Sequence, residues 1–418
     1  MNKLTISYDK QTVGFLSFNS DDETFSFEYS KTWIDEGFEL SPILKFNTNI
    51  PSKSIKNFLE NLLPEGKGQE ILSNFHNISK NNIFALIELI GKETTGALTF
   101  SLNDEEIKTS FRELPKKELA QRIKDRKNTP IEIWDKKPRL SLAGVQDKLP
   151  ILIIDDKFGF GEGKLASTHI LKFEKEDENI LLNKFLSLNL ASKAGLEIPK
   201  IKLIKIEDEE VLLIQRFDRE LKVNKEVKRK HIIDACQALD LSVLHKYERA
   251  FGKNLEDYRE GVSFKKLFSL IHKCSSPILT KKSLITWICT NLCLGNSDAH
   301  GKNISFFISK DKMTLAPFYD ILNINIYKGK YDTDFAMGID DIFSYDELSF
   351  YDIIEFCKEL NINLKGFVKE FSQVAKNIST SLDDDIFINF VETNKMIFYK
   401  NYKKDIKTRI EKLLKILK

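Results

Sequence analysis

The sequence predicts a mixed α and β protein (α/β, of the α+β kind), with strands concentrated in its first half and helices in its second. Up to about residue 228, short apolar runs alternate with polar residues and end at turn-forming residues, as is typical of β-strands. Beyond that point, apolar residues recur at helical spacing over long runs. A chain of 418 residues is long enough for about two or three domains that each bury a core.

The composition is that of an ordinary globular protein, with 42% hydrophobic and 30% charged residues. A formal net charge of +2 argues neither for nor against a nucleic-acid partner. The five cysteines are odd in number and widely spread, which is not the pattern of a disulfide framework. Cys289 and Cys293 fall one helical turn apart, but no second pair completes a zinc site. We therefore expect buried free thiols.

The sequence shows no sign of membrane insertion or export. The chain begins with a strand-like alternation rather than an apolar leader with a cleavage site. Its longest apolar run, residues 284–294, is too short to cross a bilayer. We expect a cytoplasmic protein with no membrane contact.

Residues 1–105 are predicted to form a first unit, which offers few candidates for chemistry. We expect strands at residues 4–8, 13–18, 25–29 and 96–100, and helices at 54–63 and 83–90. The acidic residues 103–106 and a lysine-rich helix at 115–127 predict a solvated connector to the next unit.

Residues 106–227 are predicted to form a second, strand-rich unit. It opens with a small, polar stretch, SLAGVQDK (141–148), and its predicted elements then follow in a fixed order. They are a strand at 149–154, a glycine-rich loop at 155–163 that indicates a hairpin, a strand at 168–173 carrying Lys172, a helix at 179–194, and strands at 199–206 and 210–217.

Residues 228–418 are predicted to be helical, with runs at 230–241, 264–274, 281–295, 350–361, 364–377 and 384–416. A short hairpin of strands at 304–308 and 313–316 interrupts them. This hairpin follows the stretch LGNSDAHGKNIS (294–305), which is rich in groups that bind protons, metals and phosphates.

Three residues around this hairpin predict phosphoryl transfer. Asp298 and Asn303 lie five residues apart, and the hairpin is expected to return Asp320 beside Asn303. Phosphoryl transfer uses a carboxylate to orient the hydroxyl, and an amide and a carboxylate to hold Mg2+. Asp298 and Asn303 could instead be loop-capping groups, since Asp and Asn favour turns. The three residues together with the hairpin favour catalysis.

The order of elements in the second unit matches the nucleotide-binding lobe of a protein kinase, so we expect a bilobal, kinase-like fold. In such a lobe a strand lysine, here Lys172, pairs with the α and β phosphates of the nucleotide. The last strand ends at Gln215, where the hinge that holds the adenine edge would fall. The alternative for Lys172 is an edge-strand lysine whose head group reaches solvent.

Seven short segments in a fixed order carry a resemblance to a known family. They are NLLPE (61–65), GAL (96–98), SLAGVQDK (141–148), HILK (169–172), RFDR (216–219), DAHGKN (298–303) and PFYD (317–320). In this combination the chain resembles the HipA-type serine/threonine kinases, which are the toxins of bacterial toxin–antitoxin modules.

The resemblance implies a role for each matching position. Asp298 would be the catalytic aspartate, and Asn303 and Asp320 would hold Mg2+. Ser141 matches the serine on which family members phosphorylate themselves, a modification that expels the adjoining loop and silences the enzyme. The residues that would line ATP are Ala143, Gly144, Val145, Gln146, Asp147, Lys148, Lys172, Gln215, Arg216, Phe217, His300, Gly301, Lys302, Asn303, Tyr319 and Asp320.

The resemblance also implies partners. Family members with known targets phosphorylate aminoacyl-tRNA synthetases, which halts translation. They bind a small helix-turn-helix antitoxin (HipB-like) that represses the operon, so we expect contact with operator DNA only through the antitoxin. The basic helix near the C-terminus, 399–415, is expected to be solvated, with a weak DNA contact as the minority alternative.

One position departs from the family. Where members have Asn-Glu at the start of the helix in the nucleotide-binding lobe, this chain has Asn183-Lys184. Kinases use a helix glutamate to hold the strand lysine, so Glu174, Glu178 or another carboxylate would have to hold Lys172. Two other hypotheses therefore stay open, a catalytically weak kinase-fold protein that acts as antitoxin-binding co-repressor, and a small-molecule kinase.

Overall fold

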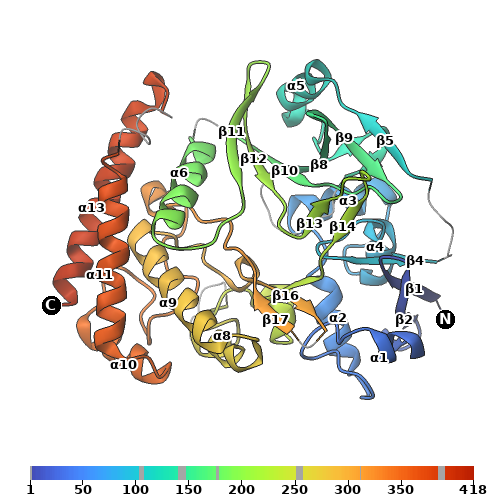
Figure 1. The fold of residues 1–418 in the computed structure, drawn as a ribbon, viewed down its shortest axis with the longest axis horizontal. Helices are drawn as coiled ribbons and strands as arrows, with labels where there is room; N and C mark the ends of the chain where they lie inside the picture. Colours follow the sequence, from blue (N-terminus) through green and yellow to red (C-terminus); the bar gives the residue numbers. More distant parts are fainter. Residues whose placement is uncertain are drawn as a thin grey trace. The chain divides into compact units, whose positions relative to one another are not determined.

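A computed structural model describes residues 2–102, 108–139, 147–175, 178–250, 258–310, 312–384 and 391–418. The chain forms two compact units, each built from segments that are far apart in the sequence (Figure 1). Unit 1 comprises Met1–Phe173, Lys200–Val243 and Phe306–Met313. Unit 2 comprises Glu174–Pro199, Leu244–Ser305 and Thr314–Lys418.

The N-terminal part of unit 1 is a four-stranded antiparallel sheet with helices packed against it. Its strand order is β3-β2-β1-β4, with bounds β1 Asn2–Tyr8, β2 Gln11–Asn19, β3 Thr24–Tyr29 and β4 Leu98–Ser101. The helices are α1 Lys31–Glu36, α2 Ser52–Glu60, α3 Lys67–His76 and α4 Ile83–Ile90. All four strands, α2 and α4 were predicted from the sequence, whereas α1 and α3 were not.

Unit 1 also contains a six-stranded antiparallel sheet, with the strand order β11-β12-β10-β8-β9-β5. Its bounds are β5 Ser110–Glu113, β8 Lys148–Ile154, β9 Lys157–Glu162, β10 His169–Phe173, β11 Ile201–Ile206 and β12 Glu209–Gln215. The predicted strands at 149–154, 168–173, 199–206 and 210–217 are confirmed, and β5 was not predicted.

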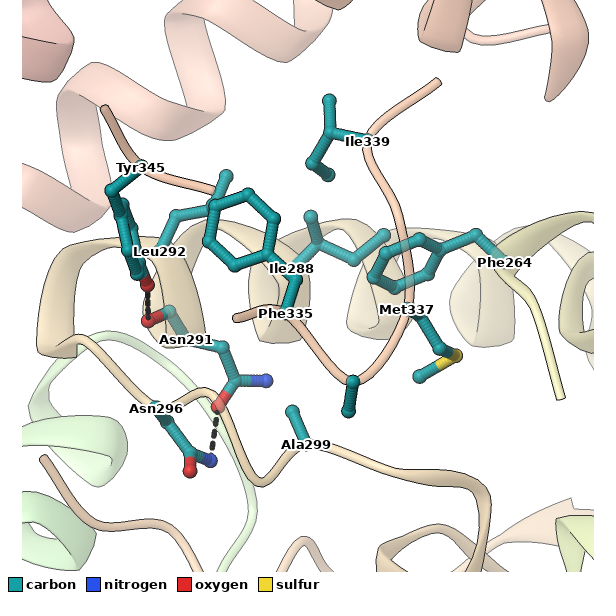
Figure 2. A pocket seen from close by; sticks show the side chains of 11 residues that line it. Phe264, Ile288, Asn291, Leu292, Asn296, Ala299, Phe335, Met337, Ile339 and Tyr345 are labelled. Atoms are coloured by element: carbon teal, nitrogen blue, oxygen red, sulfur yellow. Dashed lines mark hydrogen bonds between the residues drawn. The ribbon is translucent and has the colours of Figure 1, made fainter. Parts of the chain in front are cut away.

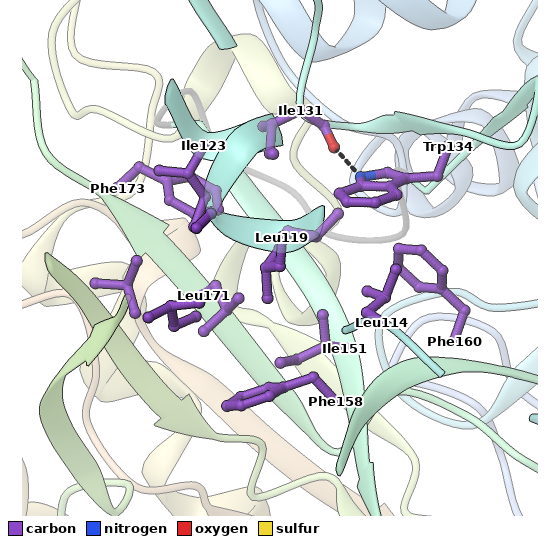
Figure 3. Close-up of a cluster of buried hydrophobic side chains, with 14 residues drawn as sticks. Leu114, Leu119, Ile123, Ile131, Trp134, Ile151, Phe158, Phe160, Leu171 and Phe173 are labelled. Carbon is purple, nitrogen blue, oxygen red and sulfur yellow. Dashed lines mark hydrogen bonds between the residues drawn. The ribbon is translucent and has the colours of Figure 1, made fainter. Parts of the chain in front are cut away.

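The helix α5 (Lys116–Lys124) covers this sheet, so the prediction of a solvated connector was wrong for it. Leu119 and Ile123 are buried in one hydrophobic cluster with Trp134 and with side chains of the strands (Figure 3). The indole N–H of Trp134 donates to the carbonyl of Ile131, which satisfies its polar atom inside the cluster. The many lysines of α5 had suggested a fully exposed helix, although one of its faces is apolar and buried.

The glycine-rich stretch 155–163 forms the predicted hairpin, but its glycines do not make the turn. The turn is made by Asp155 and Asp156, which have left-handed φ values of 49° and 60°. Gly159 instead lies inside β9, where an added Cβ would lie 2.4 Å from the Phe111 ring and 2.5 Å from the Arg112 carbonyl. Glycine is used there because β5 approaches the strand closely.

The rest of unit 1 consists of short strands and one turn of helix. They are β6 Ile133–Trp134, β7 Lys137–Pro138, β13 Arg219–Leu221, β14 Val227–Arg229, β15 Ile232–Asp234 and α7 Ala235–Ala238. The predicted helix at 230–241 was wrong, because Ile232 and Ile233 are buried on a strand that pairs with β16 (Ser305–Ser309). The short helix begins only after Asp234, which caps it. Strand β17 (Lys312–Leu315) completes that sheet, and both strands of the predicted hairpin are confirmed.

Unit 2 is helical, as predicted. Its helices are α6 Ile180–Lys193, α8 Phe264–Ser269, α9 Pro277–Leu294, α10 Phe350–Glu359, α11 Leu364–Ser381 and α13 Met396–Ile416. Figure 1 shows α9, α11 and α13 side by side, and all three pairs are in contact. The prediction of helix over 384–416 is confirmed for the part that α13 covers, and residues 385–390 lie outside the described residues.

Short 3-10 segments connect these elements. They are η1 Asp125–Lys127, η2 Val243–His245, η3 Ile271–Lys273, η4 Gly301–Asn303, η5 Asn325–Tyr327 and η6 Thr393–Lys395. All five cysteines are free and buried, as the sequence predicted. None of the described helices is both long enough and apolar enough to span a bilayer.

Candidate active site

The stretch that the sequence singled out forms a loop directly after the buried helix α9. The helix ends at Gly295, whose φ of 74° is left-handed. An added Cβ there would lie 2.6 Å from the Arg409 guanidinium, so glycine meets two requirements at this turn. The chain then leads through Asn296 and Ser297 to Asp298.

Asp298 is held in place yet remains accessible. Its Oδ1 accepts a hydrogen bond of 2.7 Å from the hydroxyl of Tyr247. Its backbone carbonyl accepts from the side-chain amide of Asn303 at 2.8 Å and from the backbone N–H of His300 at 2.9 Å. Because its side chain is 38% exposed, the carboxylate can still meet a substrate hydroxyl.

The residues between Asp298 and Asn303 are buried around the loop. His300 places its Nε2 3.8 Å from Asp298 Oδ1, and its ring packs edge-on against the Tyr247 ring at 4.9 Å. Lys302 is buried as well. An added Cβ at Gly301 would lie 2.5 Å from the Val262 side chain, so this part of the loop is tightly packed.

The segment that carries Asp320 returns beside Asn303. The hydroxyl of Tyr319 donates to the Lys302 carbonyl at 2.6 Å and lies 2.8 Å from the Ser305 hydroxyl. The N–H of Ala316 donates to the Ser305 carbonyl at 2.8 Å. Within unit 2 the structure thus brings together the predicted site residues Asp298, His300, Gly301, Lys302, Asn303, Tyr319 and Asp320.

Asp320 has two unusual features. Its φ of 55° lies in the left-handed region, which aspartate tolerates better than most residues and which recurs at functional sites. Its Oδ1 forms an ion pair with the ammonium group of Lys184 on α6, the residue that departs from the family pattern. The lysine therefore contacts an expected cation ligand.

The donor set at Asn303 and Asp320 fits Mg2+. This cation binds oxygen ligands, and protein sites usually supply one or two of them while substrate phosphates and water complete the shell. The amide nitrogen of Asn303 donates to Asp298, so its amide oxygen is the atom available as a ligand. In the described part of the chain, no group of three His, Cys, Asp or Glu side chains could hold a metal ion.

The other predicted contacts belong to unit 1. Lys172 is buried on β10, opposite Lys148 on β8 and Leu212 on β12. Since β10 is an inner strand, the alternative of an edge-strand lysine was wrong. Asp147 forms an ion pair of 3.5 Å with Lys67 on α3. Ser141, Ala143, Gly144, Val145 and Gln146 lie outside the described residues.

The segment predicted as the hinge follows β12. The N–H of Gln215 donates to the Lys200 carbonyl, and the N–H of Arg216 donates to the Thr168 carbonyl. The Phe217 ring packs edge-on against the Phe307 ring at 5.8 Å. The side chain of Arg216 is buried, so backbone atoms of this segment remain the candidates for adenine contacts.

Arg216 belongs to a buried ion network that the sequence did not reveal. Its guanidinium donates to both carboxylate oxygens of Asp218, at 3.0 and 2.8 Å, and lies 3.4 Å from Glu93. Asp218 also accepts from Arg219 at 2.6 Å and from the N–H of Gly96 at 3.1 Å. Burial would raise the pKa of Asp218, but the charges of Arg216 and Arg219 hold that pKa well below its usual range.

A small cavity lies beside the loop that carries Asp298 (Figure 2). Its volume is about 20 Å³, which is room for a single water and not for a nucleotide. The lining includes Ile288, Leu292 and Phe335, together with Asn291 and Asn296. The amide of Asn296 donates to Asn291 at 2.8 Å, which fastens the start of the loop to α9.

Comparison with known proteins identifies the family. The family model described as the HipA-like C-terminal domain matches residues 140–382, more than half of the chain, and the model of the HipA N-terminal domain matches residues 4–101. The chain belongs to the HipA family. Among its relatives is the serine/threonine-protein kinase toxin HipA of Shewanella oneidensis. The two sequences are 38% identical over 96% of this chain and 94% of that protein.

A HipA structure shares the fold. The solved complex of Shewanella oneidensis HipA with HipB and its operator DNA matches with a TM-score of 0.91 at 36% identity. The match covers 99% of this chain and 98% of that one. The predicted fold class is thereby confirmed as the mixed, kinase-like fold of HipA, and HipA membership places the chain among serine/threonine protein kinases of toxin–antitoxin systems.

Two features of the site were not predicted from the sequence. Tyr247 lies 51 residues before Asp298, so no local spacing connects the two. The contact between Lys184 and Asp320 spans 136 residues, and only the departure from the family pattern had marked Lys184.

Proposed function

We propose that the protein transfers the γ-phosphate of ATP to a serine or threonine hydroxyl of a protein substrate, with Asp298 as the catalytic aspartate. The observation that supports this most directly is the arrangement around Asp298. One carboxylate oxygen is fixed by Tyr247, the side chain remains partly exposed, and Asn303 and Asp320 stand on the adjoining segments.

The chain's own residues would divide the work as follows. Asp298 orients the substrate hydroxyl and accepts its proton as the oxygen attacks phosphorus. Asn303 and Asp320 hold Mg2+, which when bound neutralises charge on the phosphate oxygens. Lys172, His300 and Lys302 supply positive or hydrogen-bonding groups to the phosphates.

We further propose that ATP contacts both the loop 143–148 and the backbone of Gln215, Arg216 and Phe217, with Tyr319 and Gly301 lining the nucleotide. In this proposal residues 1–105 are an accessory region, residues 106–227 the nucleotide-binding part, and residues 228–418 the helical part that carries the catalytic loop. The match of a separate family model to residues 4–101 supports the first of these boundaries, between the accessory region and the rest of the chain.

Labelled ATP tests the reaction. The purified protein, incubated with Mg2+, labelled ATP and a bacterial lysate, is expected to transfer label to protein. Asp298→Asn keeps the shape of the side chain but removes the proton acceptor, so transfer should fall by about 100-fold or more. Lys328→Met, which removes an exposed lysine paired with Asp346, serves as the control. Equal transfer by wild type and Asp298→Asn would refute the catalytic role of Asp298.

We propose a helix-turn-helix antitoxin (HipB-like) as partner, with operator DNA bound through it. The full-length match to HipA in its complex with HipB and operator DNA supports this. Co-purification with the protein encoded beside this chain's gene, followed by an operator gel shift, is the test. Direct DNA binding by the chain alone would instead favour a role for the basic helix α13.

We propose that the target is a translation component such as an aminoacyl-tRNA synthetase in the cytoplasm, and that Ser141 is an autophosphorylation site. Phosphosite mapping of host proteins after expression addresses the target, and the same spectra report on Ser141. Growth arrest without a new phosphosite on any translation component would argue against this target class.

The alternative is a catalytically weak kinase-fold protein that serves as antitoxin-binding co-repressor. It is supported by Lys184, because the helix that usually supplies a glutamate carries a cation. Both oxygens of Glu178 accept hydrogen bonds from Lys330 and Tyr331, and one oxygen of Glu174 accepts from the N–H of Ile180. ATP binding without transfer, together with antitoxin-dependent operator binding, would favour this alternative.

A further inference from the structure

The helix α6 is fastened to the segment that follows Asp320. The side-chain amide of Asn183 donates to the carbonyl of Asn323 and accepts from its N–H, both at 2.8 Å. Both asparagines are fully buried. The side chain of Asn183 thus bonds both backbone polar groups of Asn323. These two hydrogen bonds fix the start of α6 against this segment.

Lys184 follows Asn183. At this position the family pattern has a negatively charged glutamate, whereas this chain has a positively charged lysine. Its side chain is 6% exposed, and its ammonium group contacts Oδ1 of Asp320, whose side chain is 28% exposed. A buried ammonium needs a counter-charge, because removing it from water without one is strongly unfavourable. Asp320 supplies a counter-charge, and its side chain remains partly exposed to solvent.

We propose that Lys184 is a built-in counter-ion of the cation ligand Asp320. Its charge weakens the binding of a divalent cation at Asp320, and its ammonium group competes with that cation for Oδ1. The inference rests on the proposed function, in which Asp320 holds Mg2+.

Electrostatics gives the direction of the effect. A divalent cation held by Asp320 would share one carboxylate with the ammonium group of Lys184, and like charges so close to each other repel even at a high effective dielectric constant. In other kinases the corresponding helix position is a glutamate that holds the strand lysine. Here the sign of the side chain is reversed, so α6 acts on the cation ligand and sets how much divalent cation the site requires.

The test measures cation affinity, independent of turnover. Mn2+ is titrated into the full-length protein with a non-hydrolysable ATP analogue, and free Mn2+ is followed by electron paramagnetic resonance. Lys184→Met removes the charge, and Lys184→Gln removes the charge but keeps a hydrogen-bond donor. Both should bind Mn2+ about tenfold more tightly than wild type, because the repulsion is gone. Lys184→Arg keeps the charge and should match wild type.

A matched control separates the contact from a general change in charge. Lys330→Met also removes one ion-paired lysine of unit 2, the partner of Glu178 at 2.6 Å, and should leave Mn2+ affinity unchanged. If Lys184→Gln and Lys184→Met bind Mn2+ no more tightly than wild type, the inference is wrong. It is equally wrong if Lys184→Arg or Lys330→Met tightens binding to the same extent. If the methionine variant fails to fold, the glutamine variant still allows the test, because it keeps a polar group in the buried site.

The failure of this inference can be told apart from the failure of the proposed function. Asp298-dependent label transfer with unchanged Mn2+ affinity in the Lys184 variants overturns the inference alone. Tighter Mn2+ binding in those variants without any label transfer supports the counter-ion and overturns the kinase reaction. Asp320→Asn should weaken Mn2+ binding, and an unchanged affinity in that variant would remove the basis of both.

Discussion

At the scale of single residues, the hydroxyl of Tyr247 is the contact that fixes the carboxylate of Asp298. Tyr247→Phe removes this hydrogen bond and leaves the ring against His300, so the carboxylate loses its orientation but the loop keeps its packing. We expect kcat to fall about tenfold with little change in the KM for ATP, as for a lost positioning contact. Steady-state kinetics with labelled ATP measure both constants.

Tyr331→Phe is the matched control for this prediction. It removes another tyrosine hydroxyl of unit 2, which donates to Glu178 at 2.6 Å and is not placed in the catalytic machinery. A kcat for Tyr247→Phe equal to that of the control would show that Tyr247 does not position Asp298.

His231 predicts how stability depends on pH. Burial lowers the pKa of its imidazole to about 4 in the folded protein, against 6.5 as the ordinary value. Between these values the unfolded chain binds the proton and the folded chain does not, so stability falls as the pH drops from about 6.5 to 4. The loss from this residue is about 3 kcal/mol. Urea denaturation at a series of pH values measures it, and His231→Gln should flatten the slope while the exposed His272→Gln should not.

At the scale of elements, Gly159 allows β5 to pair closely with β9. Gly159→Ala would place a methyl group against the Phe111 ring and the Arg112 carbonyl, so we expect the edge strand to loosen and the protein to lose about 1 to 3 kcal/mol of stability. The matched control is Gly366→Ala in α11, where the nearest atom would be 3.5 Å away and no loss is expected. Hydrogen exchange at β5 tests for local loosening, and equal protection in both variants would contradict the prediction.

Most long elements were predictable because their apolar periodicity agrees with their burial. Strands β1, β2 and β3 and helices α4 and α11 follow this rule. The failures have specific causes. The run at 230–241 contains helix-forming residues, but pairing of β15 with β16 overrides local propensity. In α5 the lysines suggested a solvated helix, although Leu119, Ala120 and Ile123 form a buried face.

The site was predictable where its residues are close in sequence. Asp298, His300 and Asn303 share one loop, and the hairpin spacing indicated where Asp320 would return. Tyr247 and the partner of Lys184 come from distant segments, and a single sequence contains no signal that links such pairs. Arg216 was predicted near the nucleotide from its place after a strand, and sequence patterns alone do not show that its side chain enters a buried ion network.

At the scale of the whole molecule, this network ties the N-terminal residues to the segment after β12 within unit 1. Asp218→Asn would leave Arg216 and Arg219 buried with one counter-charge fewer, and burial lowers the pKa of Arg219 to about 9 even with Asp218 present. Breaking a buried ion pair on one side costs about 3 to 5 kcal/mol. Denaturant titration should show this loss, and Asp155→Asn, in an exposed pair with Lys225, should show none.

Limited proteolysis separates a local effect from a global one for the same variant. Since Glu93 and Gly96 contact the network directly, Asp218→Asn should release the N-terminal region earlier than wild type. Release at the wild-type rate would mean that the network does not anchor that region.

Because every cysteine is buried, the native protein is expected not to react with thiol reagents. A cysteine introduced at an exposed position, such as Lys10 of unit 1 or Lys404 of unit 2, would therefore be the single reactive thiol of its variant. Fluorescent labels at both positions would turn the folded protein into a distance reporter without removal of any native cysteine. Nucleotide, antitoxin or substrate could then be added, and the separation of the two units followed as each one binds.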